Sequence, residues 1–281
     1  MKVIHNCKHH SFHVDFCINI HNELLKRGHE SIISNDESHY DDADFTIQPD
    51  EACKRQGGLG IFINHCFPFI PQKKFFLEEN FINEVRNNSD YIFCPSKKYE
   101  EWYKQYGLPT KVVGMSKLDN LFFDRKKEQT TILYAPTWNQ NLTSSHDVQI
   151  KELEKYGKVM FRGHPAFYDN EHTLFECLEK ATIVISDYSS VGLDSIVLNI
   201  PTIIFESEEF KNKRYDHISN DALEATICVD TQDGLMKAIE RYISEPEYLE
   251  KERIKHSNIL CNHQSNSSVV LVDTLEKMLS E

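Results

Sequence analysis

The chain has 281 residues, 40% of them hydrophobic, so it can bury a substantial core in one large domain or, as we expect, in two smaller ones. Its 44 acidic residues outnumber its 31 basic residues, and the net charge of −13 excludes general binding to nucleic acid, which needs a basic surface. It has no run of about 18 apolar residues, and its first residues lack the apolar stretch of a secretory signal, so we expect a cytoplasmic protein.

Short β-branched runs alternate with helical patterns in the first part of the chain. Val3-Ile4 precedes a helical pattern from Asp15 to Arg27, which Gly28 ends. Further apolar runs follow at Ser31 to Ser34, Gly60 to Asn64, Tyr91 to Cys94 and Lys111 to Gly114. This alternation is typical of βα units in a parallel sheet, and it predicts a Rossmann-like domain over residues 1–118.

A second series of βα units begins after the polar segment Asp124 to Thr130, which predicts a linker within residues 115–130. Its apolar runs are Thr131 to Ala135, Val159 to Phe161, Ala181 to Ile185, Thr202 to Phe205 and Ala225 to Val229. Helical patterns separate these runs, and two further segments, Pro246 to Ile259 and Ser267 to Leu279, predict closing helices. We therefore expect a second Rossmann-like domain over residues 119–281.

Polar segments follow three of the predicted strands of this second domain. Pro136-Thr137 follows the first strand, Arg162-Gly163-His164-Pro165 the second, and Ser186-Asp187-Tyr188-Ser189-Ser190 the third. A doubly wound parallel sheet binds its ligand beyond the carboxyl ends of its strands. We expect the three segments to lie along one edge of the sheet and to form the candidate site.

Ser189 and Ser190 lie where a predicted helix starts. Their hydroxyls and the backbone N–H groups of the first helical turn can hold a phosphate, although a serine at this place can also serve only as a helix cap. Asp194 is four residues beyond Ser190 and shares its helical face, so it either reaches a ligand hydroxyl or is a solvated helix residue.

Arg162 and His164 are two residues apart, so they point to the same side of an extended segment, and Pro165 favours that conformation for His164. A guanidinium beside an imidazole suits a diphosphate whose charge grows as a bond breaks. A His-Pro pair after a strand is more often structural, but the neighbouring polar segments favour a functional role here.

Histidines also mark the first domain. His65, after Asn64, ends an apolar run and is either a general base or a hydrogen-bonded loop histidine. The N-terminal stretch "HNCKHHSFH" suggests a metal site, but we expect no Asp or Glu partner to lie near it, and we expect neither a metal nor another cofactor. Its candidate ligands are His5, Cys7, His9, His10 and His13.

Two pairs of lysines lie close to aromatic residues. Lys73-Lys74 is followed by Phe75 and Phe76, and Lys97-Lys98 by Tyr99, Trp102 and Tyr103. Each pair is either a solvated helix face or part of a surface in peripheral contact with anionic lipid at the inner membrane face, or with an anionic polymer.

Three motifs resemble a known family in their order and spacing. "ILYAPTW", "FRGHP" and "SDYSSVGLDSIVLNIPTIIF" resemble the C-terminal half of the CDP-glycerol glycerophosphotransferases that build teichoic acids and some bacterial capsules. "YIFCPSKKYEEWYKQYGLPTKVVGMSKLDNLF" is similar to the segment that leads into the C-terminal domain of that family, and the resemblance covers roughly residues 60 to 205.

The resemblance implies an α/β fold of the GT-B class, in which two Rossmann-like domains flank a cleft. The C-terminal domain would hold the activated donor through the cradle Ser186 to Ser190, with Pro136, Thr137 and Asp194 on the same rim. Arg162 and His164 match the diphosphate-contacting motif of the family. His65 matches its proposed base, although the family pattern Trp-His-Gly-x-Pro reads Asn64-His65-Cys66-Phe67-Pro68 in this chain.

The implied reaction moves a polyol phosphate, glycerol phosphate by expectation, to a hydroxyl of a cell-surface polymer or lipid-linked acceptor. The implied partners are CDP-glycerol or a similar CDP-polyol and a glycan, polyol-phosphate or lipid-linked acceptor. His65 would take the proton of the attacking hydroxyl, while Arg162 and His164 would offset charge on the departing CMP.

Three other functions remain open at this point. A GT-B glycosyltransferase would use a nucleotide sugar and direct the attack at its anomeric carbon. A nucleotide-sugar 2-epimerase shares the fold but needs several carboxylates in its cleft as acid and base. A non-catalytic binding module would hold a nucleotide or polymer without turnover.

Overall fold

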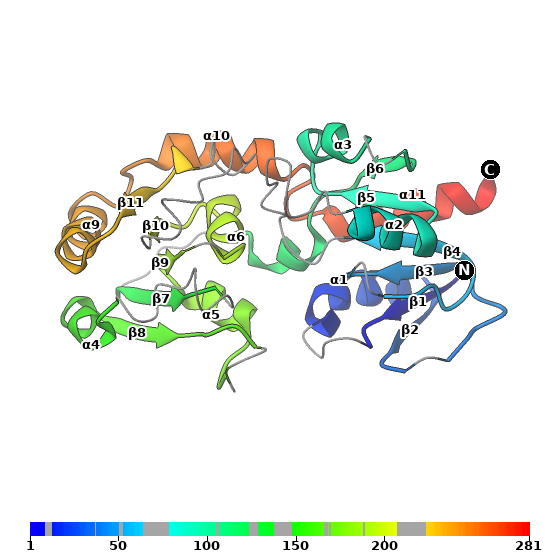
Figure 1. Ribbon diagram of the computed structural model, residues 1–281, viewed down its shortest axis with the longest axis horizontal. Helices are drawn as coiled ribbons and strands as arrows, with labels where there is room; N and C mark the ends of the chain where they lie inside the picture. Colours follow the sequence, from blue (N-terminus) through cyan, green and yellow to red (C-terminus); the bar gives the residue numbers. More distant parts are fainter. Residues whose placement is uncertain are drawn as a thin grey trace. The chain divides into compact units, whose positions relative to one another are not determined.

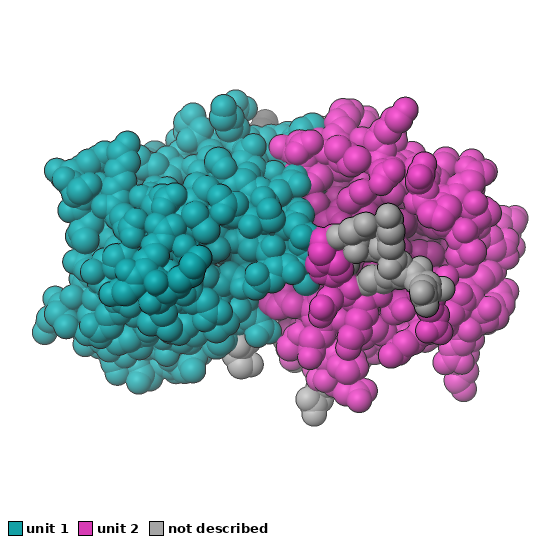
Figure 2. Space-filling view, turned by 180° about the vertical axis from the view of Figure 1, so that it is seen from behind, with its two compact units in different colours: residues 1–68, 73–122, 259–281 teal, residues 69–72, 123–258 magenta. Residues whose placement is uncertain are grey.

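The computed structural model describes residues 1–8, 13–36, 38–50, 53–63, 79–104, 107–123, 129–137, 148–165, 168, 170–187, 189–206 and 223–281. The chain forms two compact units, and each is built around its own parallel sheet (Figures 1 and 2). The first unit comprises residues 1–68, 73–122 and 259–281, and the second comprises residues 69–72 and 123–258. The predicted α/β class with two Rossmann-like sheets is confirmed.

The sheet of the first unit has six parallel strands in the order β2-β1-β3-β4-β5-β6. Their bounds are β1 (Lys2–Asn6), β2 (Glu30–Ser34), β3 (Phe45–Gln48), β4 (Leu59–Ile63), β5 (Tyr91–Cys94) and β6 (Thr110–Val112). The strand order reverses between β1 and β3, which is the doubly wound topology. Every strand predicted for this part of the chain is present, and β3 is an additional strand.

The helices of the first unit are α1 (His13–Lys26), α2 (Glu79–Asn88), α3 (Lys97–Tyr103), the 3₁₀ helix η2 (Ser116–Leu121) and α11 (Ser267–Ser280). The helices α1 and α11 pack together, and both contribute to one core with β1, β3 and β4. Arg27 at the end of α1 joins them, because its Nη1 atom lies 2.5 Å from Asp273 and 3.0 Å from Glu276 of α11. The predicted closing helix α11 thus belongs with the first unit, whereas the sequence division after residue 118 groups it with the second.

Asp119 in η2 caps the N-terminus of α11. Its Oδ1 accepts the Ser267 N–H at 2.9 Å, and its Oδ2 accepts the N–H and the hydroxyl of Ser268 at 2.7 and 2.6 Å. A carboxylate at this position satisfies orphan N–H groups and interacts favourably with the helix dipole. The segment that the sequence assigns to a linker therefore begins with a structured element that fastens the last helix to the first unit.

Replacement of Asp119 by alanine is expected to lower the free energy of unfolding by about 2 kcal/mol, because a helix cap and charge-assisted hydrogen bonds are lost together. Urea denaturation followed by circular dichroism measures this change. Asp119→Asn keeps one acceptor oxygen, so its free energy of unfolding should fall less than that of Asp119→Ala. A loss below about 0.5 kcal/mol for Asp119→Ala would show that α11 is held without this cap.

His5 of β1 is fully buried and forms a small polar cluster with Ser31 and His21. Its Nε2 and the Nδ1 of His21 each lie 2.9 Å from the Ser31 hydroxyl oxygen. Burial, together with the neighbouring His21, lowers the pKa of His5 to about 3 from its ordinary 6.5. This imidazole therefore stays neutral in the folded chain at physiological pH.

The depressed pKa of His5 predicts acid lability. Between pH 6.5 and pH 3 the unfolded chain binds a proton at this site that the folded chain does not, so stability falls as the pH falls through this window. The loss at pH 5 relative to pH 7 is expected to be about 2 kcal/mol. Urea denaturation at both pH values measures it. In His5→Gln the difference between the two pH values should shrink by that amount, and an unchanged difference would contradict the assignment.

The second unit has a five-stranded parallel sheet in the order β11-β10-β9-β7-β8. Its strands are β7 (Thr131–Ala135), β8 (Lys158–Phe161), β9 (Ile183–Ser186), β10 (Thr202–Phe205) and β11 (Ile227–Val229). Ala135 pairs with Ser186, and Tyr134 pairs with Phe161. The carboxyl ends of β9, β7 and β8 are therefore aligned, and the strand order reverses between β7 and β9.

Helices cover both faces of this second sheet. They are α4 (Ile150–Leu153), the 3₁₀ helix η3 (Glu154–Tyr156), α5 (Leu174–Lys180), α6 (Val191–Val197), α9 (Gln232–Ser244) and α10 (Glu250–Leu260). Leu235 and Ile239 of α9 share a core with Ile203, whereas Gly192 of α6 packs on Ile204, whose side chain points to the other face. Because both faces are covered, a ligand meets this sheet most directly at its strand ends.

Candidate donor-binding edge of the second unit

Three polar segments lie along the carboxyl edge of the second sheet. Residues 136–137 follow β7, residues 162–165 follow β8, and residues 187, 189 and 190 follow β9, whereas Tyr188 lies outside the described residues. These three strands are neighbours and run parallel, so the structure brings the segments together as the sequence predicts. Residues 136, 137, 187, 189 and 190 also flank the point where the strand order reverses, which is where doubly wound sheets bind ligands.

Two hydrogen bonds join the ends of β7 and β9. The Thr137 N–H donates to Asp187 Oδ1 at 2.7 Å, and the Ser186 hydroxyl donates to the Ala135 carbonyl at 3.0 Å. Ser186, Asp187 and Thr137 are all buried. The side chains of Ser186 and Asp187 therefore hold the two strand ends in register. The hydrogen bond from Thr137 to Asp187 also fixes the backbone of Pro136 and Thr137.

Ser189 and Ser190 stand immediately before α6, as the sequence predicts. Ser190 is the N-cap residue, but its side chain makes no capping hydrogen bond to the helix among the described residues. The Val191 N–H approaches the Ser189 hydroxyl only at a long 3.4 Å. Among the described residues the Ser189 hydroxyl thus caps α6 weakly and the Ser190 hydroxyl does not cap it, and both residues are half-buried.

Asp194 lies in the first turn of α6 and is completely buried, with 0% of its surface exposed. The interpretation of Asp194 as a solvated helix residue is therefore wrong. Its backbone N–H bonds to the Ser190 carbonyl at 3.0 Å, which places it on the same turn as the serines. The reason for its burial is that α6 packs tightly on the sheet, with all of its residues buried.

Arg162 and His164 follow the edge strand β8 in a loop with its own internal bonds. The Arg162 N–H donates to the Tyr134 carbonyl at 2.9 Å and extends the ladder between β7 and β8. The His164 carbonyl accepts the Tyr168 N–H at 3.1 Å. Burial raises the pKa of the Cys177 thiol of α5, and the positive charge of Arg162 partly opposes that rise. The Arg162 charge is thus within electrostatic range of α5.

The loop after β8 depends on residues that sequence reasoning did not single out. The Tyr168 ring lies so close to Gly163 that an added Cβ would be 2.1 Å from its Cδ2, so Gly163 serves the packing of this ring. Asn170 donates to the Gly163 carbonyl at 3.0 Å. The Phe161 and Tyr168 rings meet edge to face at 5.3 Å, and each residue is 40% exposed. In the sequence, Tyr168 and Asn170 are indicated only by the aromatic and Asn residues that follow Pro165.

The predicted base of the first unit, His65, and its neighbour Asn64 lie outside the described residues, directly after β4 in the sequence.

The N-terminal histidines that the structure describes do not lie together in one site. His5 is buried in the sheet, and the His13 Nε2 lies 3.9 Å from Asp50 Oδ2, so the expectation that no carboxylate lies near these histidines is wrong. Within the described parts of the chain, no three His, Cys, Asp or Glu residues are grouped to hold a metal.

The aromatic residues beside Lys97 and Lys98 are mostly internal. Tyr99 and Tyr103 of α3 are buried, so they cannot form an exposed surface with the two lysines. Lys73 and Lys74 lie outside the described residues. None of the helices in the described parts of the chain combines the length and apolarity needed to cross a membrane.

Several solved structures share this fold. The wall teichoic acid polymerase TagF, as a histidine-to-alanine variant, matches with a TM-score of 0.75 and 15% identity, covering 99% of this chain and 89% of that chain. A TagF variant soaked with CDPG gives the same TM-score and identity over 99% and 88% of the two chains. The UDP-GlcNAc 2-epimerase from Neisseria meningitidis bound to UDP-GlcNAc matches with a TM-score of 0.63 and 12% identity, covering 99% of this chain and 100% of that chain. No curated protein matches this chain at a significant level.

The family comparison is more specific than these fold matches. The model of the family described as CDP-glycerol:poly(glycerophosphate) glycerophosphotransferase matches residues 72–277. That range contains all three polar segments of the second unit and η2 of the first. Because the match spans well over half of the 281 residues, the chain belongs to the CDP-glycerol glycerophosphotransferase family and is a transferase of that type.

Proposed function

We propose that this chain transfers glycerol phosphate from CDP-glycerol to a hydroxyl of a poly(glycerophosphate) or related polyol-phosphate acceptor and releases CMP. The family match over residues 72–277 is the observation that carries the proposal. The alignment of the described residues after β7, β8 and β9 along one sheet edge supports it, because the activated donor needs a site for two phosphates.

The donor is proposed to bind at this edge of the second unit. Ser189 and Ser190 contribute their hydroxyls to the phosphates, at the start of α6, where the helix dipole favours negative charge. Asp187 and Ser186 act on the donor indirectly, because their side chains fix the backbone of residues 135–137. Asp194, buried on the same turn, is proposed to bind a donor hydroxyl.

Arg162 and His164 are proposed to stabilise charge on the leaving group. An oxygen of the acceptor forms a bond to the β-phosphorus, and the bond from that phosphorus to the oxygen of CMP breaks. Negative charge accumulates on CMP, and a guanidinium with an imidazole beside it offsets that charge. His65 takes the proton of the attacking hydroxyl. The polar groups act by positioning and charge, which are the main means of phosphoryl-transfer catalysis.

We further infer a cytoplasmic location, with the enzyme working on acceptors held at the inner membrane face. The net charge of −13 disfavours broad electrostatic attraction to an anionic membrane, so such contact would be local. Lys97 on α3 is exposed, and among the described residues it supports such a local contact with the membrane.

Calorimetry tests the donor site directly. CMP and CDP-glycerol are expected to bind the full chain more tightly than UDP or GDP. The double variant Ser189→Ala with Ser190→Ala should weaken CDP-glycerol binding by about 10-fold, the value of a lost charge-assisted hydrogen bond. Ser244→Ala, an exposed serine at the end of α9, serves as the control. Preferential binding of UDP or GDP would favour the glycosyltransferase alternative.

A further inference from the structure

Two aromatic rings meet on the surface of the second unit, where its edge strand β8 ends. Phe161 is the last residue of β8, and Tyr168 lies in the segment that follows. The two ring centres are 5.3 Å apart in an edge-to-face arrangement, and each residue is 40% exposed. A single exposed apolar side chain is ordinary, but two rings that meet beside a polar candidate site indicate a place where a ligand binds.

The rest of the second unit holds this aromatic pair, Phe161 and Tyr168, in place. The Phe161 ring lies 5.8 Å from the ring of Tyr134, which is fully buried in β7. Tyr168 packs so closely on Gly163 that a Cβ there would lie 2.1 Å from its ring, and its N–H donates to the His164 carbonyl at 3.1 Å. The pair is therefore preorganised, so a ligand that binds it does not have to order the two side chains first.

The aromatic pair and the proposed phosphate site lie on opposite sides of one sheet edge. Phe161 is two residues beyond Val159 and shares its face of the sheet, where Val159 packs on the core that α9 completes. Ser189 and Ser190 instead precede α6, which packs on the other face. Only β7 lies between β9 and β8, so the ends of these two strands are about 10 Å apart, which is two strand spacings. A donor that straddles this edge meets the serines with one end and the aromatic pair with the other.

The chemistry of the aromatic pair matches the base of the donor. A pyrimidine base has a flat π face, and such a face stacks on aromatic side chains. The phosphates of the donor are charged and need polar partners, whereas its base gains free energy when it leaves water for an apolar ring. In CDP-glycerol the ribose and the α-phosphate join the base to the β-phosphate, so one donor molecule can extend from the serines to the aromatic pair.

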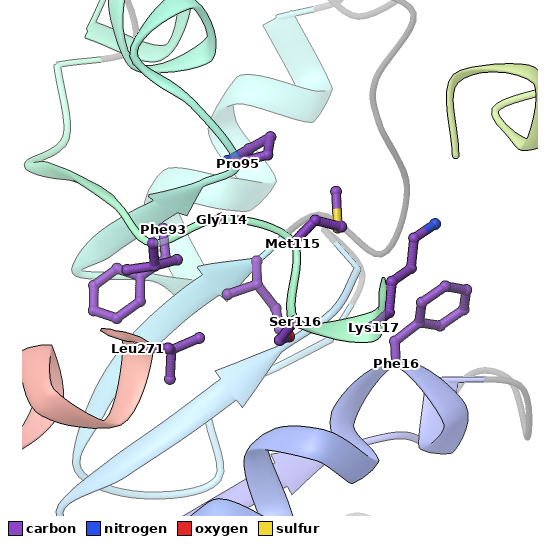
Figure 3. A pocket seen from close by; sticks show the side chains of 10 residues that line it. Phe16, Phe93, Pro95, Gly114, Met115, Ser116, Lys117 and Leu271 are labelled. Atoms are coloured by element: carbon purple, nitrogen blue, oxygen red, sulfur yellow. The ribbon is translucent and has the colours of Figure 1, made fainter. Parts of the chain in front are cut away.

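A pocket in the first unit offers no alternative place for the base. Phe16, Phe93 and Leu271 are among the residues that line it (Figure 3). Its inner space is about 20 Å³, which is room for little more than one water molecule. The aromatic pair, by contrast, is open to solvent, so a base can reach it without a rearrangement of the fold.

We propose that Phe161 and Tyr168 form the platform on which the cytosine base of the donor stacks. This inference rests on the proposed function, because it takes the donor to be a cytidine nucleotide bound at this edge. The platform contributes affinity for any flat base and does not by itself distinguish cytosine from uracil, because both present a π face. Discrimination between the two bases therefore requires hydrogen-bonding groups outside the aromatic pair.

The test compares CMP with ribose 5-phosphate, which keeps the sugar and the phosphate but lacks the base. Both are titrated into the full chain by calorimetry. Tyr168→Leu and Phe161→Leu should each weaken CMP binding by about 10-fold and leave the Kd for ribose 5-phosphate unchanged. Tyr168→Phe keeps the ring and should bind CMP as the wild type does. Phe123→Leu removes a ring that is 43% exposed elsewhere in the second unit, and it should change neither Kd.

Three results overturn the proposal. The first is CMP binding to both leucine variants within about threefold of the wild type. The second is wild-type binding of CMP no tighter than that of ribose 5-phosphate. The third is a raised KM for a glycerol phosphate oligomer in the leucine variants with unchanged CMP affinity, which would assign the rings to the acceptor.

Two further outcomes separate this proposal from the proposed function. If the wild type binds UMP or GMP in place of CMP and the leucine variants weaken that nucleotide, the CDP-glycerol function is wrong and the stacking platform stands. If CMP is released normally from CDP-glycerol but the leucine variants keep their CMP affinity, only this proposal fails. Should the leucine variants not fold, a crystal structure of the wild type soaked with CMP decides: cytosine against either ring supports the proposal, and a base bound only elsewhere overturns it.

Discussion

Replacement of His65 by alanine is expected to lower kcat with CDP-glycerol and a phosphate-bearing acceptor by about 10²-fold or more, the usual contribution of a general base. The Kd for CDP-glycerol should stay near the wild-type value, because the proposed donor site lies on the other unit. Steady-state kinetics combined with calorimetry measures both quantities. This separation of kcat from donor affinity is what distinguishes a base from a donor-binding residue.

A matched control for His65 is available in the same unit. His39 is exposed and pairs with Asp41 at 3.3 Å, so His39→Ala should leave both kcat and donor affinity unchanged. His164→Ala should instead weaken stabilisation of the diphosphate and with it donor binding. Wild-type turnover in His65→Ala, with circular dichroism showing an intact fold, would identify His65 as a loop histidine without a catalytic role.

Loss of the Arg162 guanidinium is expected to lower the rate of transfer about as much as loss of His65. Arg162→Met should lower kcat/KM for CDP-glycerol by about 10²-fold to 10³-fold, because one preorganised group that stabilises developing charge contributes about that much. Arg162→Lys keeps the charge without the planar fork and should recover only part of the activity. Steady-state kinetics of all three proteins gives the comparison.

The matched control for Arg162 is Arg241, an exposed residue of α9 in the same unit that pairs with Glu245. Arg241→Met should leave kcat/KM unchanged. Activity of Arg162→Met within about threefold of the wild type would assign Arg162 to the structure of the loop rather than to the diphosphate.

The sequence predicted most strands well because their apolar runs are uninterrupted. β5, β7 and β10 have the predicted bounds. β9 begins two residues later than predicted, because Ala181 still ends α5 with a hydrogen bond to the Cys177 carbonyl at 2.9 Å. Such a shift depends on a helix cap that a β-branched pattern does not reveal.

β3 was not predicted because half of its residues are polar. Thr46 and Gln48 are buried, and each donates to a carbonyl of the following loop at 2.6 Å, to Gly57 and Cys53 respectively. A buried polar residue is stable only when such a partner exists, and the partner becomes apparent only in the folded chain. Polarity alone therefore made this central strand resemble a loop.

The candidate site shows the same limit. Its three segments were predictable because residues after parallel strands meet at one edge. The bond from Thr137 to Asp187 and the burial of Asp194 were not, because both depend on how α6 and the strand ends pack.

The most direct test of the proposed function follows the two products of one reaction. The chain is incubated with CDP-glycerol labelled in its glycerol and with a glycerol phosphate oligomer, while CMP release and label in the oligomer are both measured. The expected result is CMP formed in equal amount to the label transferred, with no product from UDP- or GDP-sugars in parallel incubations. Release of UDP or GDP from a nucleotide sugar in place of CMP, or donor binding without any transfer, would contradict the assignment of this chain as a glycerophosphotransferase.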